Sequence, residues 1–175
     1  MKWRLIVYRL PSEPSRFRVA AWRHMVKVGA LSLHQSMWAI PSGSEFDESL
    51  DKLRGLVDQA EGQLMVFDVD PSSESIPELE SLYTEQREAE WIEFIAECGK
   101  FDAEIDREFA KEKFTLAELD EEEQNLDRLK RWYRELRVRD QFGAESAPLS
   151  EERLKSADQT LERFAEAVFQ ARQQS

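Results

Sequence analysis

Cysteine is almost absent from this sequence, because Cys98 is the single one among 175 residues. A lone cysteine cannot form a disulfide within the chain, and it cannot build a thiolate zinc site by itself. The frameworks of paired cysteines that stabilise small secreted domains are therefore excluded. The shortage fits the reducing cytoplasm, which is where we expect this protein to act.

Long apolar runs are missing as well. No stretch approaches the roughly 20 apolar residues that cross a membrane, and the short apolar segment in residues 1–10 lacks the cleavage signal of a secretory leader. Glycine and proline are scarce, with six of each, whereas 34% of the residues are charged. With ten Phe and five Trp, this composition predicts a folded protein of long solvated helices, without membrane contact.

Positive charge is in short supply overall, since 24 Lys and Arg face 36 Asp and Glu, for a net charge of −12. The deficit is uneven, because residues 1–30 hold seven cations and a single anion, Glu13. Their net charge is +6, which leaves a net charge of −18 for the remaining residues. Such a chain is not a general polyanion binder, yet its N-terminal end can present a local positive face. The alternative is that these cations pair with acidic helices further along the chain.

The first 72 residues alternate between strand and helix patterns. We expect, in order, a strand at 2–10, a helix at 16–28, hairpin strands at 30–34 and 37–41, a helix at 44–60 and a strand at 63–69. Gly29 should cap the first helix and Ser44 the second. Trp3, Leu5 and Val7 form the clearly apolar face of the first strand. Short links and right-handed crossovers then give an antiparallel sheet with two helices on one face, the ferredoxin-like βαββαβ arrangement.

Residues 73–175 carry three helical patterns, so the fold class is α+β, with a domain at 1–72 followed by a three-helix extension. The first helix opens at a capping box at Ser75, the second opens at one at Thr115, and Ser150 should cap the third. Their apolar stripes must be buried on each other or on the sheet. We also expect all five tryptophans in the core: Trp3, Trp22, Trp38, Trp91 and Trp132.

Two separated stretches resemble a known family. The first reads W-R-L-I-V-Y-R-L-P from Trp3, continues with S-R-F-R-V-A-A-W-R from Ser15, and ends with G-A-L-S-L-H-Q-S-M-W-A-I-P from Gly29. The second reads L-D-R-L-K-R-W-Y-R-E-L-R-V-R-D-Q-F-G-A from Leu126, and R-E-A-E-W from Arg87 is a third point of similarity. Together they are similar to the N-terminal domain of ChrB, the chromate resistance regulatory protein, over the whole chain.

This resemblance implies a bacterial cytoplasmic protein tied to chromate-responsive expression of an efflux system, as a repressor or a sensor. ChrB proteins usually carry a further C-terminal domain, whose function we do not expect within these 175 residues. The first half also resembles the ferredoxin-like domain of PaaX-type repressors and of small CRISPR-associated nucleases. In those nucleases a metal-binding Asp ends the first strand. This chain has Tyr8-Arg9 there, and an Arg cannot replace an oxygen ligand of Mg²⁺, which argues against nuclease activity.

The main candidate binding residues are basic and lie on the first helix and the strand before it. Forked guanidinium groups suit both the phosphates of DNA and a small oxyanion such as chromate. The alternative is a solvated helix surface, or ion pairs with acidic helices. The candidates are Arg9, Arg16, Arg18, Arg23 and Lys27.

A second basic cluster adjoins Trp132 and Tyr133. Spacings of three and four residues place several of its members on one helix face. Ion pairing along the helix with Asp127, Glu135 and Asp140 is the alternative explanation. The members are Lys130, Arg131, Arg134, Arg137 and Arg139.

No residue pattern indicates catalysis. His24 and His34 are the only histidines, which is too few for a zinc site. Either could activate Cys98 as a nucleophile only if the fold brought the two together. We therefore expect no cofactor, no metal and no enzymatic activity.

Two functions remain open from the sequence. One is a non-enzymatic module of chromate-responsive transcription that contacts promoter DNA or another protein through the first helix. The other is an oxyanion-sensing or oligomerising module without DNA contact, whose partners would be chromate or a related oxyanion and a second copy of the chain. The basic N-terminal end favours the first, and the net charge of −12 favours the second.

Overall fold

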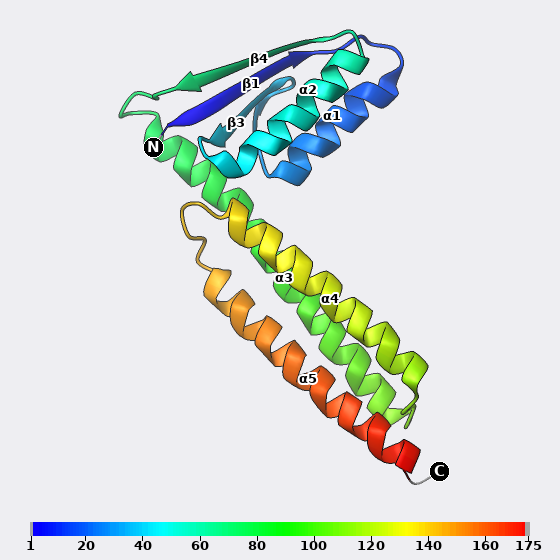
Figure 1. The fold of residues 1–175 in the computed structure, drawn as a ribbon. Helices are drawn as coiled ribbons and strands as arrows, with labels where there is room; N and C mark the ends of the chain where they lie inside the picture. The colour runs from blue at the N-terminus through cyan, green and yellow to red at the C-terminus, as the bar shows by residue number, and fades with distance from the viewer. Residues whose placement is uncertain (1, 174–175) are drawn as a thin grey trace. The chain divides into compact units, whose positions relative to one another are not determined.

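A computed structural model describes residues 2–173 of this chain, which form an α+β architecture. Within that range lie one four-stranded antiparallel sheet and five α-helices (Figure 1), so the predicted α+β class is confirmed. The chain divides into two compact units between Tyr83 and Thr84, which we call unit 1 and unit 2. The predicted boundary at residues 72 and 73 stands before this division, and residues 1, 174 and 175, at the outer ends of the predicted domains, lie outside the described range.

Unit 1 contains the sheet and the first two helices. The strands lie in the order β2-β3-β1-β4, and each neighbouring pair is antiparallel. These segments agree closely with the predicted ones, although the predicted capping group of the second helix, the side chain of Ser44, is outside what the structure describes. The elements are β1 (Trp3–Arg9), α1 (Ser15–Val28), β2 (Leu31–His34), β3 (Met37–Pro41), a 3-10 helix (Ser44–Phe46), α2 (Asp47–Gln59) and β4 (Gln63–Val69).

β1 pairs on both sides, and its alternation separates two faces of the sheet. Ile6 and Tyr8 point into the core that α1 and α2 close, so both helices lie on the face that carries the mixed set of β1 side chains (Figure 1). The clearly apolar set lies on the opposite face. There Trp3 is fully buried and meets Tyr83 edge to face, with ring centroids 5.8 Å apart. Both faces of β1 are therefore apolar at their centre.

α1 ends as predicted at Gly29, whose φ of 81° lies in the left-handed region that favours glycine. The N–H groups of Gly29 and Ala30 donate to the carbonyl oxygens of Val26 and Met25, at 3.0 and 3.1 Å. These bonds satisfy carbonyl groups that the end of a helix leaves without partners, and they turn the chain directly into β2.

Unit 2 consists of helices that run side by side: most of α3 (Ile76–Ala110), then α4 (Leu116–Arg139) and α5 (Ala147–Gln173) (Figure 1). The N-cap at Thr115 is confirmed, because its hydroxyl accepts a hydrogen bond from the Glu118 N–H at 3.3 Å. The prediction that Ser150 caps the last helix is wrong. α5 begins three residues earlier, and the buried Ser150 hydroxyl donates to the Ser146 carbonyl at 2.9 Å. Pro148 fits the first turn, where a helix needs no N–H.

The buried stripe of α3 follows a spacing of three and four residues, but it is not purely apolar. Arg87 and Glu108 occupy two of its positions and are 1% and 3% exposed. Glu122 on α4 is equally buried, at 2%. The pattern of apolar residues in the sequence could not reveal these positions. The apolar members of the α3 stripe in unit 2 are Trp91, Phe94, Cys98, Phe101 and Ile105.

Two glycines give a paired test of unit 1. A Cβ at Gly62 would lie 2.6 Å from the Arg9 carbonyl oxygen, whereas a Cβ at Gly55, inside α2, would meet nothing within 4 Å. We expect Gly62→Ala to lower the free energy of unfolding by about 1–3 kcal/mol through overpacking. We expect Gly55→Ala to raise it by about 0.5–1 kcal/mol through helix propensity. Urea titrations of both variants measure this, and an equal effect of the two changes would contradict the close approach of β1 to Gly62.

Candidate functional site

The orientation of α1 is set by the side that it buries. Ala21 and Met25 are buried in the core of unit 1. On the same helix, His24 Nε2 donates to the carbonyl oxygen of Ser49 in α2 at 2.7 Å. Contacts with the sheet and with α2 thus hold one side of α1, and the opposite side is left to solvent.

The outward side of α1 carries the basic residues predicted from the sequence. Arg16, Arg18, Arg23 and Lys27 are all exposed. Within residues 2–173 none of the four forms an ion pair, although the Arg16 guanidinium lies 4.9 Å from the centre of the Phe17 ring. For these four cations, the described part of the chain therefore does not show the pairing with acidic residues that the sequence left open.

An apolar row runs between these cations. Val19, Trp22 and Val26 are 41%, 54% and 43% exposed, so the assignment of Trp22 to the core is wrong. At 100° per residue, Arg16, Arg23 and Lys27 lie along one side of this row and Arg18 lies on the other. We call these seven residues the basic face of α1. Large apolar side chains bracketed by unpaired cations are unusual on a helix that has no partner.

Arg9 does not belong to this face. It ends β1 opposite Gln63 of β4, and because Tyr8 points toward the helices, Arg9 lies on the other side of the sheet. Arg4, earlier on the same strand, is engaged by two carboxylates. Its guanidinium contacts Asp47, and its Nε lies 3.0 Å from Asp68 Oδ1.

A shallow hollow of about 550 Å³ adjoins the start of α1. Arg18 and the hydroxyl-bearing Ser12 and Ser15 line it, together with Glu13 and Pro14. Donors near a helix N-terminus attract anions, but the Glu13 carboxylate at the same place repels them. The hollow is therefore a weaker anion site than its arginine and serines alone would make.

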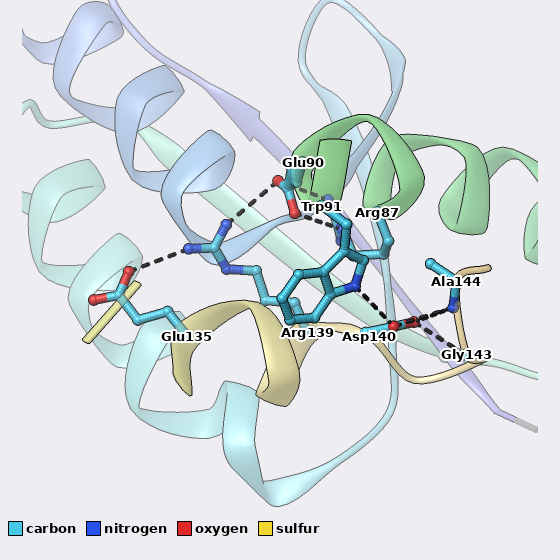
Figure 2. A network of polar contacts seen from close by, with 8 residues as sticks. All are labelled: Arg87, Glu90, Trp91, Glu135, Arg139, Asp140, Gly143 and Ala144. Atoms are coloured by element: carbon cyan, nitrogen blue, oxygen red, sulfur yellow. Dashed lines mark hydrogen bonds and ion pairs between the residues drawn. The ribbon is translucent and has the colours of Figure 1, made fainter. Parts of the chain in front are cut away.

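The second basic cluster is divided by the structure. Arg131, Arg134 and Arg137 are exposed, whereas the side chain of Arg139 is only 12% exposed. Figure 2 shows the Arg139 guanidinium between two carboxylates, at 3.3 Å from Glu90 and 3.4 Å from Glu135. Arg139 is thus held inside unit 2, and ion pairing accounts for this member of the cluster.

Arg139 belongs to a network that joins the helices of unit 2. Arg87 Nε lies 2.8 Å from Glu90 Oε2, so one glutamate serves both arginines (Figure 2). Trp91 Nε1 donates to Asp140 at 2.9 Å, and the Asp140 carboxylate also accepts the N–H groups of Gly143 and Ala144, each at 3.0 Å. The network fixes the chain between α4 and α5 against α3. Its partners lie up to 49 residues apart, which is why sequence spacing missed it.

The single thiol of the chain lies in the core of unit 2. Cys98 is fully buried, and burial followed by the nearby Asp102 raises the pKa of its thiol to about 11, so it is protonated at neutral pH. Across residues 2–173 no three His, Cys, Asp or Glu side chains come close enough to hold a metal. None of the described helices is long and apolar enough to cross a membrane.

The sequence matches a protein family. The family described as "Protein ChrB, N-terminal" matches residues 18–175, which includes most of α1 and all later elements. A search of curated proteins and a search of solved structures each found no match.

The division of the second cluster leads to a paired prediction. Arg139→Ala removes one of the two cations beside the half-buried Glu90 and the cation beside the exposed Glu135, and we expect it to lower the free energy of unfolding by about 1–3 kcal/mol. Arg131→Ala removes an exposed side chain and should change it by less than about 0.5 kcal/mol. Chemical denaturation of both variants decides the matter, and equal stability of the two would show that the network contributes nothing.

Glu122 gives a pH-dependent prediction. Burial, and to a smaller extent the nearby Glu104, raise the pKa of this carboxyl, although Asn125 donates a hydrogen bond to it at 3.2 Å. Because the folded protein holds this proton more tightly than the unfolded chain, the group stabilises the fold below its unfolded pKa, and this contribution is lost as pH rises through the folded pKa. Glu122→Gln should therefore be more stable than the wild type at pH 7, with a difference that shrinks in acid.

Urea titrations over a series of pH values measure this difference. Glu123→Gln, at an exposed position of the same helix, serves as the matched control. A Glu122→Gln variant that is less stable than the wild type at neutral pH would contradict the assigned direction.

Proposed function

This chain belongs to the ChrB N-terminal family, and we propose that it is a non-enzymatic regulator of chromate-responsive transcription that binds promoter DNA through α1. Membership of the family suggests a regulatory protein connected with chromate resistance. The observation that carries the DNA-binding part is the basic face of α1, whose four cations are exposed and free of ion pairs with the described residues. In this proposal the protein acts in the bacterial cytoplasm and needs no cofactor.

The spread of the charges favours a polyanion over a small oxyanion. Arg16 and Lys27 are eleven residues apart, which is about 16 Å along a helix. A single tetrahedral oxyanion is far smaller than this span, and cations on a convex helix surface do not converge on one point. A row of phosphates along a nucleic-acid strand can meet several of them at once.

The apolar row suggests how α1 would be placed on a duplex. The major groove of DNA is wide enough for one α-helix. With α1 in the groove, Arg16, Arg23 and Lys27 would face one phosphate backbone and Arg18 the other. Trp22 and its two valine neighbours would then lie over sugars and base edges, where apolar contacts such as those with the thymine methyl group are made.

We also infer that unit 1 is a ferredoxin-like domain. Its element order is βαββαβ apart from one 3-10 turn, and the strand order β2-β3-β1-β4 with antiparallel neighbours supports the assignment. This fold hosts many unrelated functions, so the assignment itself says nothing of DNA. It explains why α1 and α2 share one layer, with the outer side of α1 open.

Oxyanion sensing without DNA contact is the second candidate. The hollow beside Arg18 favours it, since a guanidinium and two serine hydroxyls can bind a tetrahedral anion. Calorimetry with chromate and with sulfate separates this candidate from the first. Heat with chromate, lost in Arg18→Ala and retained in Arg23→Ala, would support sensing at the hollow.

The DNA-binding proposal is tested by titrating the full chain with duplex DNA from the promoter of a chromate efflux gene, at several salt concentrations. Contacts with three or four phosphates predict that log K falls with log[salt] with a slope of about −3 to −4. Arg23→Ala should weaken binding to specific and unrelated duplexes alike, and it should reduce the slope by about 1.

Arg172→Ala is the matched control, because it removes an exposed arginine from α5 in unit 2. It should bind like the wild type. Absence of binding at low salt, or equal loss in both variants, would reject α1 as the contact with DNA.

A further inference from the structure

The two edges of the sheet in unit 1 differ in how they would meet another strand. An edge strand exposes a row of backbone N–H and C=O groups, which can pair with a strand of another chain. β2 has only four residues, and a bulge between Ser32 and His34 interrupts its pairing with β3. Short length and a bulge are two features that natural proteins use against such pairing. The β2 edge is therefore protected.

The β4 edge has none of these features. β4 has seven residues and pairs with β1 in unbroken register from Gln63 to Val69. Among the described residues β1 is its only strand partner, so the backbone groups on its other side have no strand to bond. Its sequence contains no Lys, Arg or Pro, and Asp68 is its single charge. The second edge is thus long, regular and open.

Two large apolar side chains mark this edge. Met65 and Phe67 are 50% and 48% exposed. They lie opposite Val7 and Leu5 of β1, on the face of the sheet away from α1 and α2. Those two β1 residues are themselves only half-buried. Apolar surface continues from the middle of the sheet to its open edge, which is typical of an interaction site.

We propose that β4 is a dimerisation edge, at which two copies of this chain pair antiparallel through β4, centred on Val66, and join their sheets into one of eight strands. The pairing gives a hydrogen-bond partner to the outward N–H and C=O groups of β4 in both copies. It also covers the apolar side chains at the edge.

The β4 sequence is complementary to itself in this register. Val66 lies opposite its own copy, and Met65 of each chain lies opposite Phe67 of the other, on the face of the sheet away from α1 and α2. Methionine sulfur beside an aromatic ring is a favourable contact, and cross-strand pairs of this kind stabilise sheets. A second copy therefore supplies both the backbone groups and the side chains that the edge needs.

The charges permit this pairing although the whole chain carries −12. Asp68 lies opposite Leu64 of the other copy, so the two Asp68 residues are four positions apart, about 14 Å along the strands. That distance exceeds the roughly 8–10 Å over which exposed charges act at physiological salt. Each Asp68 also has a cation of its own chain, since Arg4 Nε lies 3.0 Å away.

The full-length protein tests the proposal by its mass in solution. A strand pair is small beside the roughly 800 Å² per partner of a stable interface, so sedimentation should be followed from micromolar to submillimolar concentration. The wild-type mass should rise toward twice 20.5 kDa. Phe67→Lys should stay at the monomer mass, whereas Phe169→Lys, at a 57% exposed aromatic position on α5, should dimerise like the wild type.

Cross-linking tests the register of the strand pair and does not depend on the loss of the dimer in Phe67→Lys. Met65→Cys and Phe67→Cys variants, mixed under mild oxidation, should form a covalent dimer, and each alone should form far less, because residue 65 faces 67 and not 65. Cys98 is fully buried and does not interfere. A wild type that stays monomeric, a Phe67→Lys variant that still dimerises, or equal cross-linking in the single variants overturns the proposal. Circular dichroism shows whether Phe67→Lys is folded. If it is unfolded, the cross-linking result decides the outcome.

Discussion

The alternation of side chains along β1 is the constraint on which unit 1 depends. β1 is hydrogen-bonded to β3 on one side and to β4 on the other. None of its side chains can therefore move to the opposite face of the sheet without breaking backbone hydrogen bonds to both strands. Its even-numbered residues Ile6 and Tyr8 pack against α1 and α2, and this packing determines which side of α1 faces outward. Its odd-numbered residues carry the apolar surface that extends to β4. Because β1 has two apolar faces, α1 with its basic face lies on one side of the sheet, and the apolar surface that reaches the β4 edge lies on the other.

The order of strands and helices could be predicted from the sequence because it depends on local signals. Gly29 needs a positive φ, and the cap at Thr115 involves a group three residues away, so neither depends on distant packing. The side of β1 that the helices cover could not be predicted, since both sides are apolar. Trp22 was misassigned because tryptophan side chains are buried in most proteins, and only the packing of Ala21 and Met25 shows which side of α1 is buried.

The candidate site, too, could be predicted only in part. The cations of α1 are neighbours along the chain, so helical spacing brought them together correctly. Arg139 looked like another member of a basic cluster, yet Glu90, 49 residues earlier, holds it inside unit 2. Distant partners of this kind leave no local pattern.

The core of unit 2 carries polar residues at regular positions, and each has its own partner. Arg87 meets Glu90, Glu108 lies 3.0 Å from Lys111, and Asn125 donates to Glu122. An apolar stripe tolerates a shift of one helix along another, whereas a buried charge without its partner is costly. Each of these three pairs lies within a single helix or at its end and moves with it. The pair between Glu90 of α3 and Arg139 of α4 is the one that favours one register of α3 against α4.

The exposed indole of Trp22 has a consequence for how this molecule can be observed. Three of the other tryptophans, Trp3, Trp38 and Trp91, are no more than 3% exposed, and Trp132 is half-buried. A dissolved fluorescence quencher will thus reach the indole on α1 before the rest. Whatever docks on that helix must shield it, so the chain carries a built-in optical reporter for occupancy of its own basic surface.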